Sequence, residues 1–198
     1  MKLIVGLGNP GVKHEYNRHN FGWLSLTYRL HFKYNGANNK LIKIVEDNEK
    51  YKYYMYNDNE LYLYSLTYMN DTGIAVKEVV DTFKIDKKDI LIVCDDLNLD
   101  FGSLKLRANG SDGRHKGLGS IIEHLNTDEF ARLRCGIGKA LTDDQTIYDY
   151  VLSNFNIIEM MKMKNILHSI NGAIDYWLSY DIEKAISYIT NNIKQVSK

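Results

Sequence analysis

The sequence contains one proline, two cysteines and no net charge, and each scarcity argues against a class of protein. Two cysteines supply at most one disulfide, so this is no disulfide-stapled scaffold and we expect a reducing, cytosolic compartment. The 25 basic and 25 acidic side chains cancel, which removes the overall basic charge typical of nucleic-acid binders. No apolar run reaches the roughly 18 residues of a membrane helix, so we expect neither a membrane anchor nor a signal peptide.

The remaining composition is that of an ordinary globular protein. With 198 residues, 44% of them apolar, we expect a single domain over residues 1–198. The charges are unevenly distributed, because residues 1–50 and 101–140 are locally basic and residues 51–100 are acidic. This asymmetry is a weak indication of one polyanion-facing side.

Hydrophobic periodicity predicts alternating strands and helices. Strands are predicted over residues 2–7, 40–46, 51–56, 60–66, 89–94, 104–106 and 133–137. Helices are predicted from near His19, and over residues 74–83, 117–125, 158–178 and 182–193. The Tyr-rich second to fourth strands read as an antiparallel meander. We therefore expect an α/β fold, a single domain with a mixed, mostly parallel twisted sheet and helices on both faces.

A glycine-rich turn follows the first strand. The segment Gly6-Leu7-Gly8-Asn9-Pro10-Gly11 matches the dinucleotide-binding fingerprint, and a nucleotide-dependent oxidoreductase is one hypothesis. Polar residues follow the turn, however, where that fold requires a helix to open against the pyrophosphate. Asn9 is the informative residue here, because its amide offers both a donor and an acceptor at the mouth of the sheet.

His19 and Asp95 form a candidate base and its orienting group. Asp95 follows a buried strand, and α/β domains place catalytic groups at the carboxyl ends of such strands. A carboxylate beside the imidazole would fix its tautomer and keep it basic enough to deprotonate water. A purely structural role is the alternative for a lone histidine. Asp96 points to the other side of the strand, which favours a role as a loop or capping carboxylate.

Other candidate chemistries are weaker. Cys94 and Cys135 lie in apolar strands, which predicts buried, inert thiols. Ligands drawn from His14, His19 and the two aspartates lack compact spacing, so we predict no metal site. Ser111 lacks a nucleophile-elbow context and reads as part of a loop. Without a nucleophile, an activated water must attack.

Seven segments, in order, match one family pattern. They are Gly6-Leu7-Gly8-Asn9-Pro10-Gly11, Arg18-His19-Asn20-Phe21-Gly22, Thr67-Tyr68-Met69-Asn70-Asp71-Thr72-Gly73, Cys94-Asp95-Asp96-Leu97-Asn98-Leu99, Gly113-Arg114-His115-Lys116-Gly117-Leu118, Arg132-Leu133-Arg134-Cys135-Gly136-Ile137-Gly138 and Tyr150-Val151-Leu152-Ser153. On these segments the chain resembles the bacterial peptidyl-tRNA hydrolases over nearly its whole length.

The resemblance implies hydrolysis of the ester that joins a peptidyl group to tRNA, without a cofactor. It assigns His19 as the base that activates water and Asp95 as the group that stabilises it. Asn70 would hydrogen-bond the substrate near the ester, and Asn9 would distinguish a blocked from a free aminoacyl group. Tyr68 would pack beside the acceptor end of the tRNA. The expected partner is peptidyl-tRNA, and we expect a monomer.

Two pairs of basic residues are candidates for tRNA phosphate contacts. Lys105 and Arg107 lie two apart on one predicted strand, as do Arg132 and Arg134 on another. The period of two places each pair on one sheet face. A solvated basic edge is the alternative for each residue.

The chain departs from the family pattern at two positions. His14 stands where the family has a tyrosine, with Tyr16 two residues further on, and Lys116 replaces an amide expected to hold substrate or water. An ammonium can donate to a phosphate but cannot accept, and it lowers the proton affinity of a nearby imidazole. An RNA-binding relative with weak or no hydrolase activity, using Arg114 and Lys116 for affinity, is therefore the second hypothesis.

Overall fold

The computed structural model describes residues 1–36, 42–47, 49–139 and 146–192. Its strands are β1 (Lys2–Gly6), β2 (Ile42–Asp47), β3 (Tyr51–Tyr56), β4 (Glu60–Ser65), β5 (Ile90–Asp96), β6 (Leu104–Arg107) and β7 (Ala131–Gly136). Its helices are α1 (Phe21–Gly36), α2 (Thr72–Phe83), α3 (Lys116–Leu125), α4 (Ile147–Leu152), α5 (Ile157–Ser179) and α6 (Ile182–Asn192). Short 3₁₀ turns cover Val12–His14, Arg18–Asn20, Met69–Asp71 and Lys87–Asp89.

All seven strands form one sheet in the order β2-β3-β4-β1-β5-β7-β6. The central strands β4, β1, β5 and β7 pair in parallel, whereas β2-β3, β3-β4 and β6-β7 pair antiparallel. Five strands therefore run in one direction, and only β3 and β6 oppose them. The predicted mixed, mostly parallel sheet and its antiparallel meander are confirmed.

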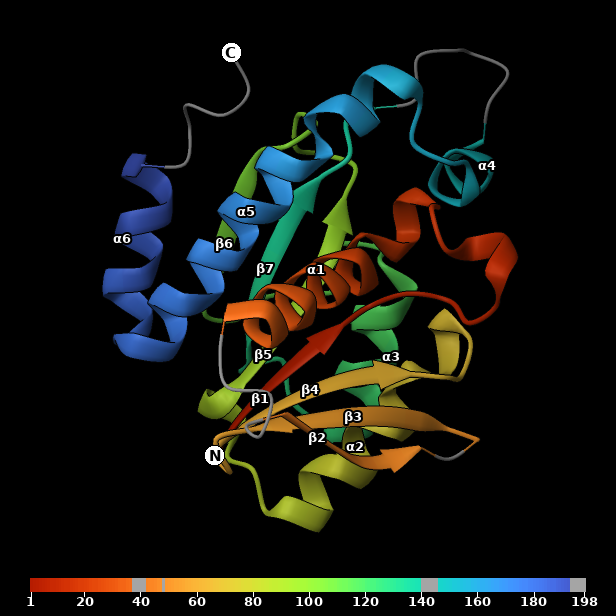
Figure 1. Ribbon diagram of the computed structural model, residues 1–198. Coiled ribbons are helices and arrows are strands. Elements are labelled where there is room, and N and C mark those ends of the chain that lie inside the picture. The colour runs from red at the N-terminus through yellow and green to blue at the C-terminus, as the bar shows by residue number, and fades with distance from the viewer. Residues whose placement is uncertain (37–41, 48, 140–145, 193–198) are drawn as a thin grey trace.

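Helices cover both faces of the sheet, as predicted (Figure 1). On one face α1, α5 and α6 pack over a core that includes Ile4 and Leu91. On the other face α2 and α3 pack over a core that includes Leu3 and Ile92. Because neighbouring residues of a strand point to opposite faces, a central strand covered on both sides must be apolar throughout. This explains the uninterrupted apolar runs of β1 and β5.

The predicted elements agree with the structure within a few residues. Part of the predicted strand over residues 40–46 lies outside the described residues, and the observed strand is Ile42–Asp47. The last helix was predicted to reach Ile193, which also lies outside them, and it is described to Asn192. Across the described ranges we find no helix whose length and hydropathy would suffice to span a membrane.

Helix α1 begins unusually close to the sheet. A β carbon at Gly22 would lie 2.3 Å from both the Leu7 nitrogen and the Val93 oxygen, a separation that real atoms do not tolerate. The backbone nitrogen of Trp23 donates to the Leu7 oxygen at 3.2 Å, and the Leu7 nitrogen donates to the Val93 oxygen at 2.9 Å. The glycine therefore permits the first turn of α1 to dock on the ends of β1 and β5.

Candidate active site

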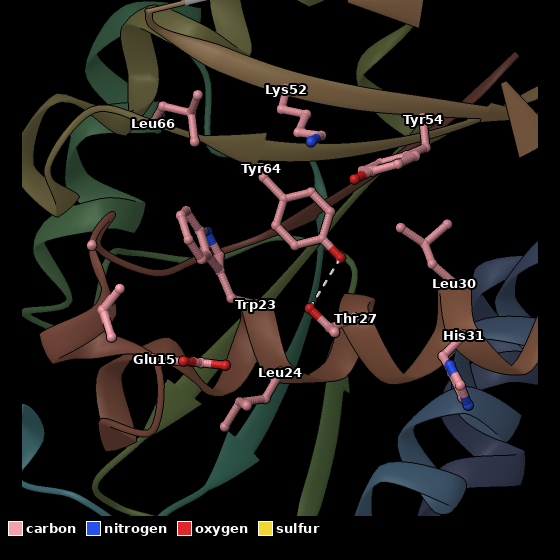
Figure 2. A pocket seen from close by; sticks show the side chains of 12 residues that line it. Glu15, Trp23, Leu24, Thr27, Leu30, His31, Lys52, Tyr54, Tyr64 and Leu66 are labelled. Atoms are coloured by element: carbon pink, nitrogen blue, oxygen red, sulfur yellow. Dashed lines mark hydrogen bonds between the residues drawn. The ribbon is translucent and has the colours of Figure 1, made fainter. Parts of the chain in front are cut away.

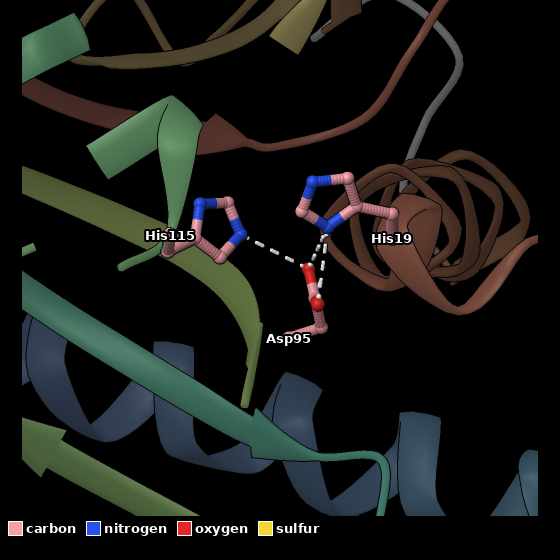
Figure 3. Close-up of side chains that lie close together, drawn as sticks. All are labelled: His19, Asp95 and His115. Carbon is pink, nitrogen blue, oxygen red and sulfur yellow. Dashed lines mark hydrogen bonds and ion pairs between the residues drawn. The ribbon is translucent and has the colours of Figure 1, made fainter. Parts of the chain in front are cut away.

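His19 and Asp95 meet at the carboxyl ends of the central strands. His19 lies in the turn before α1, and Asp95 lies near the end of β5. The imidazole Nδ1 is 2.9 Å from Asp95 Oδ1 and 3.1 Å from Oδ2 (Figure 3). The structure thus brings together the two side chains that the sequence analysis paired.

The Asp95 carboxylate is buried but charged. Its side chain is only 3% exposed, and burial alone would raise its pKa. The neighbouring His19 and His115 outweigh burial through charge and hydrogen bonding, and they hold the pKa of Asp95 well below its usual range. At neutral pH the centre therefore contains a fixed negative charge.

His115 is the functional residue that the sequence analysis did not single out. Its Nε2 lies 3.0 Å from Asp95 Oδ1, the same oxygen that His19 Nδ1 contacts, and the centroids of the two imidazole rings are 4.7 Å apart (Figure 3). Its Nδ1 accepts from the backbone nitrogens of Gly117 at 3.2 Å and Leu118 at 3.3 Å, which caps α3. A nitrogen that accepts cannot carry a proton, so the proton sits on Nε2 and is donated to the carboxylate. The helix cap thus fixes the tautomer of this ring.

His19 has the complementary arrangement. Since Nδ1 donates to Asp95, the lone pair of the neutral ring is on Nε2, for which the described residues provide no hydrogen-bond partner. Burial lowers the pKa of His19, but the charge and hydrogen bond of Asp95 more than compensate, so that this pKa lies above its ordinary value. The exposed charge of Lys116 acts in the opposite direction and lowers it. The ring is therefore a strengthened base with an open nitrogen.

The same three side chains also come close enough to be considered as metal ligands. Ligand atoms of His19, Asp95 and His115 lie within 4.8 Å of one another. A metal binds the lone pair of an imidazole nitrogen, but the nitrogens that face Asp95 carry protons in the arrangement just described. Reversing the tautomer of His115 would sacrifice the cap of α3. The donor set fits a hydrogen-bonded base better than a metal site.

Asn9 is fixed by hydrogen bonds on three sides. Its backbone nitrogen donates to Asn20 Oδ1 at 2.8 Å, and Asn20 Nδ2 donates back to its carbonyl oxygen at 2.9 Å. Its side-chain oxygen accepts from the Met69 nitrogen at 2.8 Å. Because the oxygen is used, the amide Nδ2 is the group left for a substrate. Asn20, the residue after His19, therefore helps to orient Asn9 and its amide donor.

Asn70 and Tyr68 lie further from the pair. Tyr68 is 57% exposed, and the Asn70 side chain is exposed and donates to Asp71 Oδ2 at 3.2 Å. Among the described residues, neither forms a hydrogen bond to His19 or Asp95. Both are free to contact a bound molecule, as the resemblance implies, without contacting the base.

The residues at the two family departures have different surroundings. His14 Nδ1 is 2.7 Å from Asn17 Oδ1, so its ring is held within its own turn. Tyr16 is 48% exposed. Lys116 is exposed and is the first residue of α3, next to the Asp95-bound His115. The ammonium is thus close enough to act electrostatically on His19.

The basic residues of β6 and β7 share one face of the sheet, as predicted. Lys105 is paired in register with Arg134, and Arg107 with Arg132. Lys105 and Arg107 are exposed. Arg134 is partly exposed, with Nε 2.9 Å from Asp96 Oδ2 as an ion pair. Three of the four are therefore accessible to a polyanion.

The interpretation of Arg132 as a phosphate contact is wrong. It is only 1% exposed. Its guanidinium donates to the carbonyl oxygens of Gly110, Ser111 at 3.0 Å and Asp128 at 2.7 Å. A buried guanidinium needs such acceptors; the loop before α3 provides two of them, and the segment between α3 and β7 provides the third. Arg132 therefore positions that loop, including Ser111.

The structure also bears on the alternatives raised by the glycine turn, the two cysteines and Asp96. After the glycine turn the chain forms the 3₁₀ turn Val12–His14, and α1 starts only at Phe21, so the helix does not open directly from the turn as it does in a dinucleotide site. Cys94 and Cys135 are free and fully buried, and burial raises the pKa of both thiols. Asp96 Oδ1 accepts from the Asn98 nitrogen at 2.9 Å, which is the capping role expected of it.

Comparison with known proteins agrees with this geometry. Residues 3–197 match the family model described as peptidyl-tRNA hydrolase. A peptidyl-tRNA hydrolase of Fusobacterium nucleatum is 35% identical over 204 residues and covers all of both chains. One from Rhodopirellula baltica is 39% identical over 188 residues, which are 94% of this chain and 96% of the relative.

A solved structure has the same fold. The crystal structure of peptidyl-tRNA hydrolase from Acinetobacter baumannii superposes with a TM-score of 0.81 at 27% identity, and the match covers 96% of this chain and 95% of that one. Fold, sequence and the seven motif segments thus agree over nearly the full length, and the chain belongs to the peptidyl-tRNA hydrolase family.

Proposed function

We propose that this protein hydrolyses the ester bond of peptidyl-tRNA, releasing free tRNA and peptide by means of a water activated by His19. The observation that carries the proposal is the open Nε2 of a histidine whose Nδ1 is held by a buried carboxylate, in a member of this family. The substrate class comes from the relatives, which are named peptidyl-tRNA hydrolases.

The chemistry begins with proton removal from water. His19 Nε2 accepts a proton from a water molecule as the oxygen attacks the ester carbonyl carbon. The resulting imidazolium is stabilised by the negative charge of Asp95. When the tetrahedral intermediate collapses, the bond to the ribose oxygen breaks and that oxygen takes the proton from His19. General-base assistance of this kind contributes about a hundredfold to ten-thousandfold.

Amide donors stabilise the developing oxyanion. Asn9 is held by its contacts to Asn20 and Met69, which leave its Nδ2 for the substrate, and the exposed Asn70 supplies a second amide. Donors fixed before the reaction need no reorganisation as charge develops. An ester is an activated substrate, so a covalent intermediate is not needed. The mechanism uses no cofactor and no metal.

His115 is a positioning residue in this scheme. It donates to Asp95 Oδ1, the oxygen that His19 also contacts, and so helps to hold the carboxylate in place. Because its other nitrogen caps α3, the ring cannot rotate without breaking the start of that helix. The orientation of the carboxylate is therefore coupled to the loop and helix that follow β6.

The tRNA contacts come from the surface around the centre. Lys105, Arg107 and Arg134 are accessible cations on one face, and they suit phosphates of the acceptor arm. Lys116 suits a phosphate or carbonyl close to the ester, and His14 and Tyr68 are exposed enough to contact the acceptor end. We assign these residues to substrate binding.

The test is an assay of the purified protein on N-acetyl-aminoacyl-tRNA, with and without a chelator. We expect turnover that is unaffected by the chelator and is abolished in His19→Ala, with tRNA binding retained. Tight tRNA binding without ester cleavage by the native protein would instead support the RNA-binding relative.

The proposal also covers the oligomeric state, the domain organisation and the location of the protein. We propose that it acts as a monomer, as a single domain over residues 1–198, in the cytoplasm where its substrate is produced. Light scattering coupled to size-exclusion chromatography tests the first point. A species of the 22.9 kDa chain mass is expected, and a dimer would overturn it.

A further inference from the structure

A cavity of about 670 Å³ lies beside α1, separate from the His19–Asp95 pair. Helix α1 forms one wall, and strands β3 and β4 form the other (Figure 2). Its apolar lining consists mainly of Trp23, Leu24, Leu30, Tyr54, Tyr64 and Leu66. The volume falls within the range of about 300–1,000 Å³ typical of small-ligand pockets.

Three aromatic rings define the chemistry of the cavity. The rings of Trp23 and Tyr64 lie 5.6 Å apart at 77°, and those of Tyr54 and Tyr64 lie 5.9 Å apart at 74°. These edge-to-face arrangements leave ring faces and edges for a further apolar or aromatic group. The Tyr64 hydroxyl is 3.3 Å from Thr27 Oγ1 (Figure 2). These two hydroxyl groups of the lining are therefore hydrogen-bonded to each other.

The loop that carries Asn9 borders the cavity. A β carbon at Gly8 would lie 2.6 Å from the Trp23 ring, which shows how closely the loop covers this ring. Two residues after Asn9, Gly11 lines the cavity, and a β carbon there would meet nothing within 4 Å. The cavity therefore has an open rim at Gly11, two residues along the loop from Asn9.

We propose that this cavity binds an apolar side chain of the peptidyl group, which makes it a specificity subsite for the released peptide. The inference rests on the proposed function. With the ester carbonyl at His19 and Asn9, a peptide that runs along the loop passes Gly11. Two residues of extended chain span about 7 Å, which matches two residues of loop. The side chain of the second or third residue from the ester is therefore the one that enters.

The charges at the rim favour the peptide over the tRNA. Glu15 and Lys52 both line the cavity and carry opposite charges. The rim thus has no net charge to attract a phosphodiester backbone, in contrast to the basic face of β6. Apolar walls with balanced rim charges suit an uncharged side chain.

The experiment compares matched substrates. N-acetyl-Phe and N-acetyl-Ser are each joined to the same tRNA through one, two or three glycines, and kcat/KM is measured for each. We expect the Phe series to exceed the Ser series by about tenfold at one spacing, because burying an aromatic ring contributes that much or more. Equal values at all spacings would overturn the proposal.

Filling the cavity should remove this preference. Thr27 is exposed at the cavity wall, so Thr27→Phe adds a ring there without disturbing the core. Thr27→Ser retains the hydroxyl that faces Tyr64 and is the control. We expect equal kcat/KM for Phe and Ser substrates in Thr27→Phe and an unchanged preference in Thr27→Ser. Persistence of the preference in Thr27→Phe, with Leu30→Trp as a second filling variant, would overturn the assignment.

N-acetyl-glycyl-tRNA distinguishes failure of the proposed function from failure of the subsite alone. It has no side chain to enter the cavity, so the native protein and both Thr27 variants should cleave it within about twofold of one another. If the native protein does not cleave it, the proposed function fails and the subsite fails with it. If it is cleaved but the Phe preference is absent, only the subsite fails.

Discussion

The catalytic centre and the basic face of β6 differ in how their polar groups are held. At the centre, His19, Asp95 and His115 are mostly buried and hydrogen-bonded in one fixed arrangement. On β6, Lys105 and Arg107 are exposed. Fixed groups suit a reaction that depends on geometry, whereas exposed cations suit a flexible polyanion. Turnover and tRNA affinity should therefore respond to different substitutions.

Asp95→Asn should produce the largest difference between the effect on turnover and the effect on tRNA affinity. It removes the charge that stabilises the protonated base, so kcat should fall about a hundredfold to ten-thousandfold while the Kd for tRNA changes less than about twofold. Single-turnover kinetics and a binding titration measure both. Asp96→Asn, one residue along the strand, is the matched control and should leave kcat nearly unchanged. Equal losses of kcat and affinity in Asp95→Asn would contradict its role.

Substitution of His115 should separate positioning from helix capping. His115→Asn keeps a good N-cap side chain but loses the donor to Asp95, so kcat should fall about tenfold with little change in Tm. His115→Ala loses both functions, and unfolding should become about 1 kcal/mol easier as well. Thermal melts and kcat values test this. If His115→Asn and His115→Ala had identical Tm and kcat, the ring would have only one of the two roles, positioning Asp95 or capping α3.

The basic face should show the opposite pattern. Removing both Lys105 and Arg107 should weaken tRNA binding about fivefold at low salt and reduce the salt dependence of log Kd by about 0.7–0.9 per charge. The kcat should stay within about twofold. Lys88→Ala is the control, because that exposed lysine precedes β5 at the other end of the sheet. An unchanged salt slope would remove this face from the tRNA interface.

The smallest effect is expected at the boundary between the two regions. The charge of Lys116 lowers the pKa of His19, so Lys116→Asn should raise it. A base must be deprotonated, so kcat/KM of the native protein should rise with pH through a midpoint above the ordinary histidine value of 6.5, and the variant should need a still higher pH. Below the midpoint the variant is slower, and well above it the difference vanishes. A midpoint that moves to lower pH would contradict this assignment.

Much of the fold was predictable from the sequence because the strands are buried on both faces. The apolar runs of β1 and β5 and the Tyr-rich meander needed no tertiary information. The contact of His19 with Asp95 was also predictable, since both residues follow parallel strands that end at one edge of the sheet. These predictions depend on local patterns and on one rule of topology.

The roles of His115 and Arg132 were not predictable in the same way. His115 immediately precedes a predicted helix, which is a signal for a cap, but its second contact to Asp95 depends on the path of the preceding loop. The alternation of β7 correctly placed Arg132 on one face of the sheet. It could not show that this loop supplies two carbonyl acceptors to Arg132 and that Asp128, after α3, supplies a third. Loop paths are set by tertiary contacts, which a pattern does not contain.

Gly22 limits what can change at the catalytic centre. Any larger residue there would push α1 outward by an ångström or more, since its first carbon would overlap atoms of β1 and β5. His19, three residues earlier, would move with it, and the 2.9 Å contact to Asp95 would be lost. The strength of the base is thus determined in part by a position that carries no functional group at all, where one missing methyl group keeps the imidazole within reach.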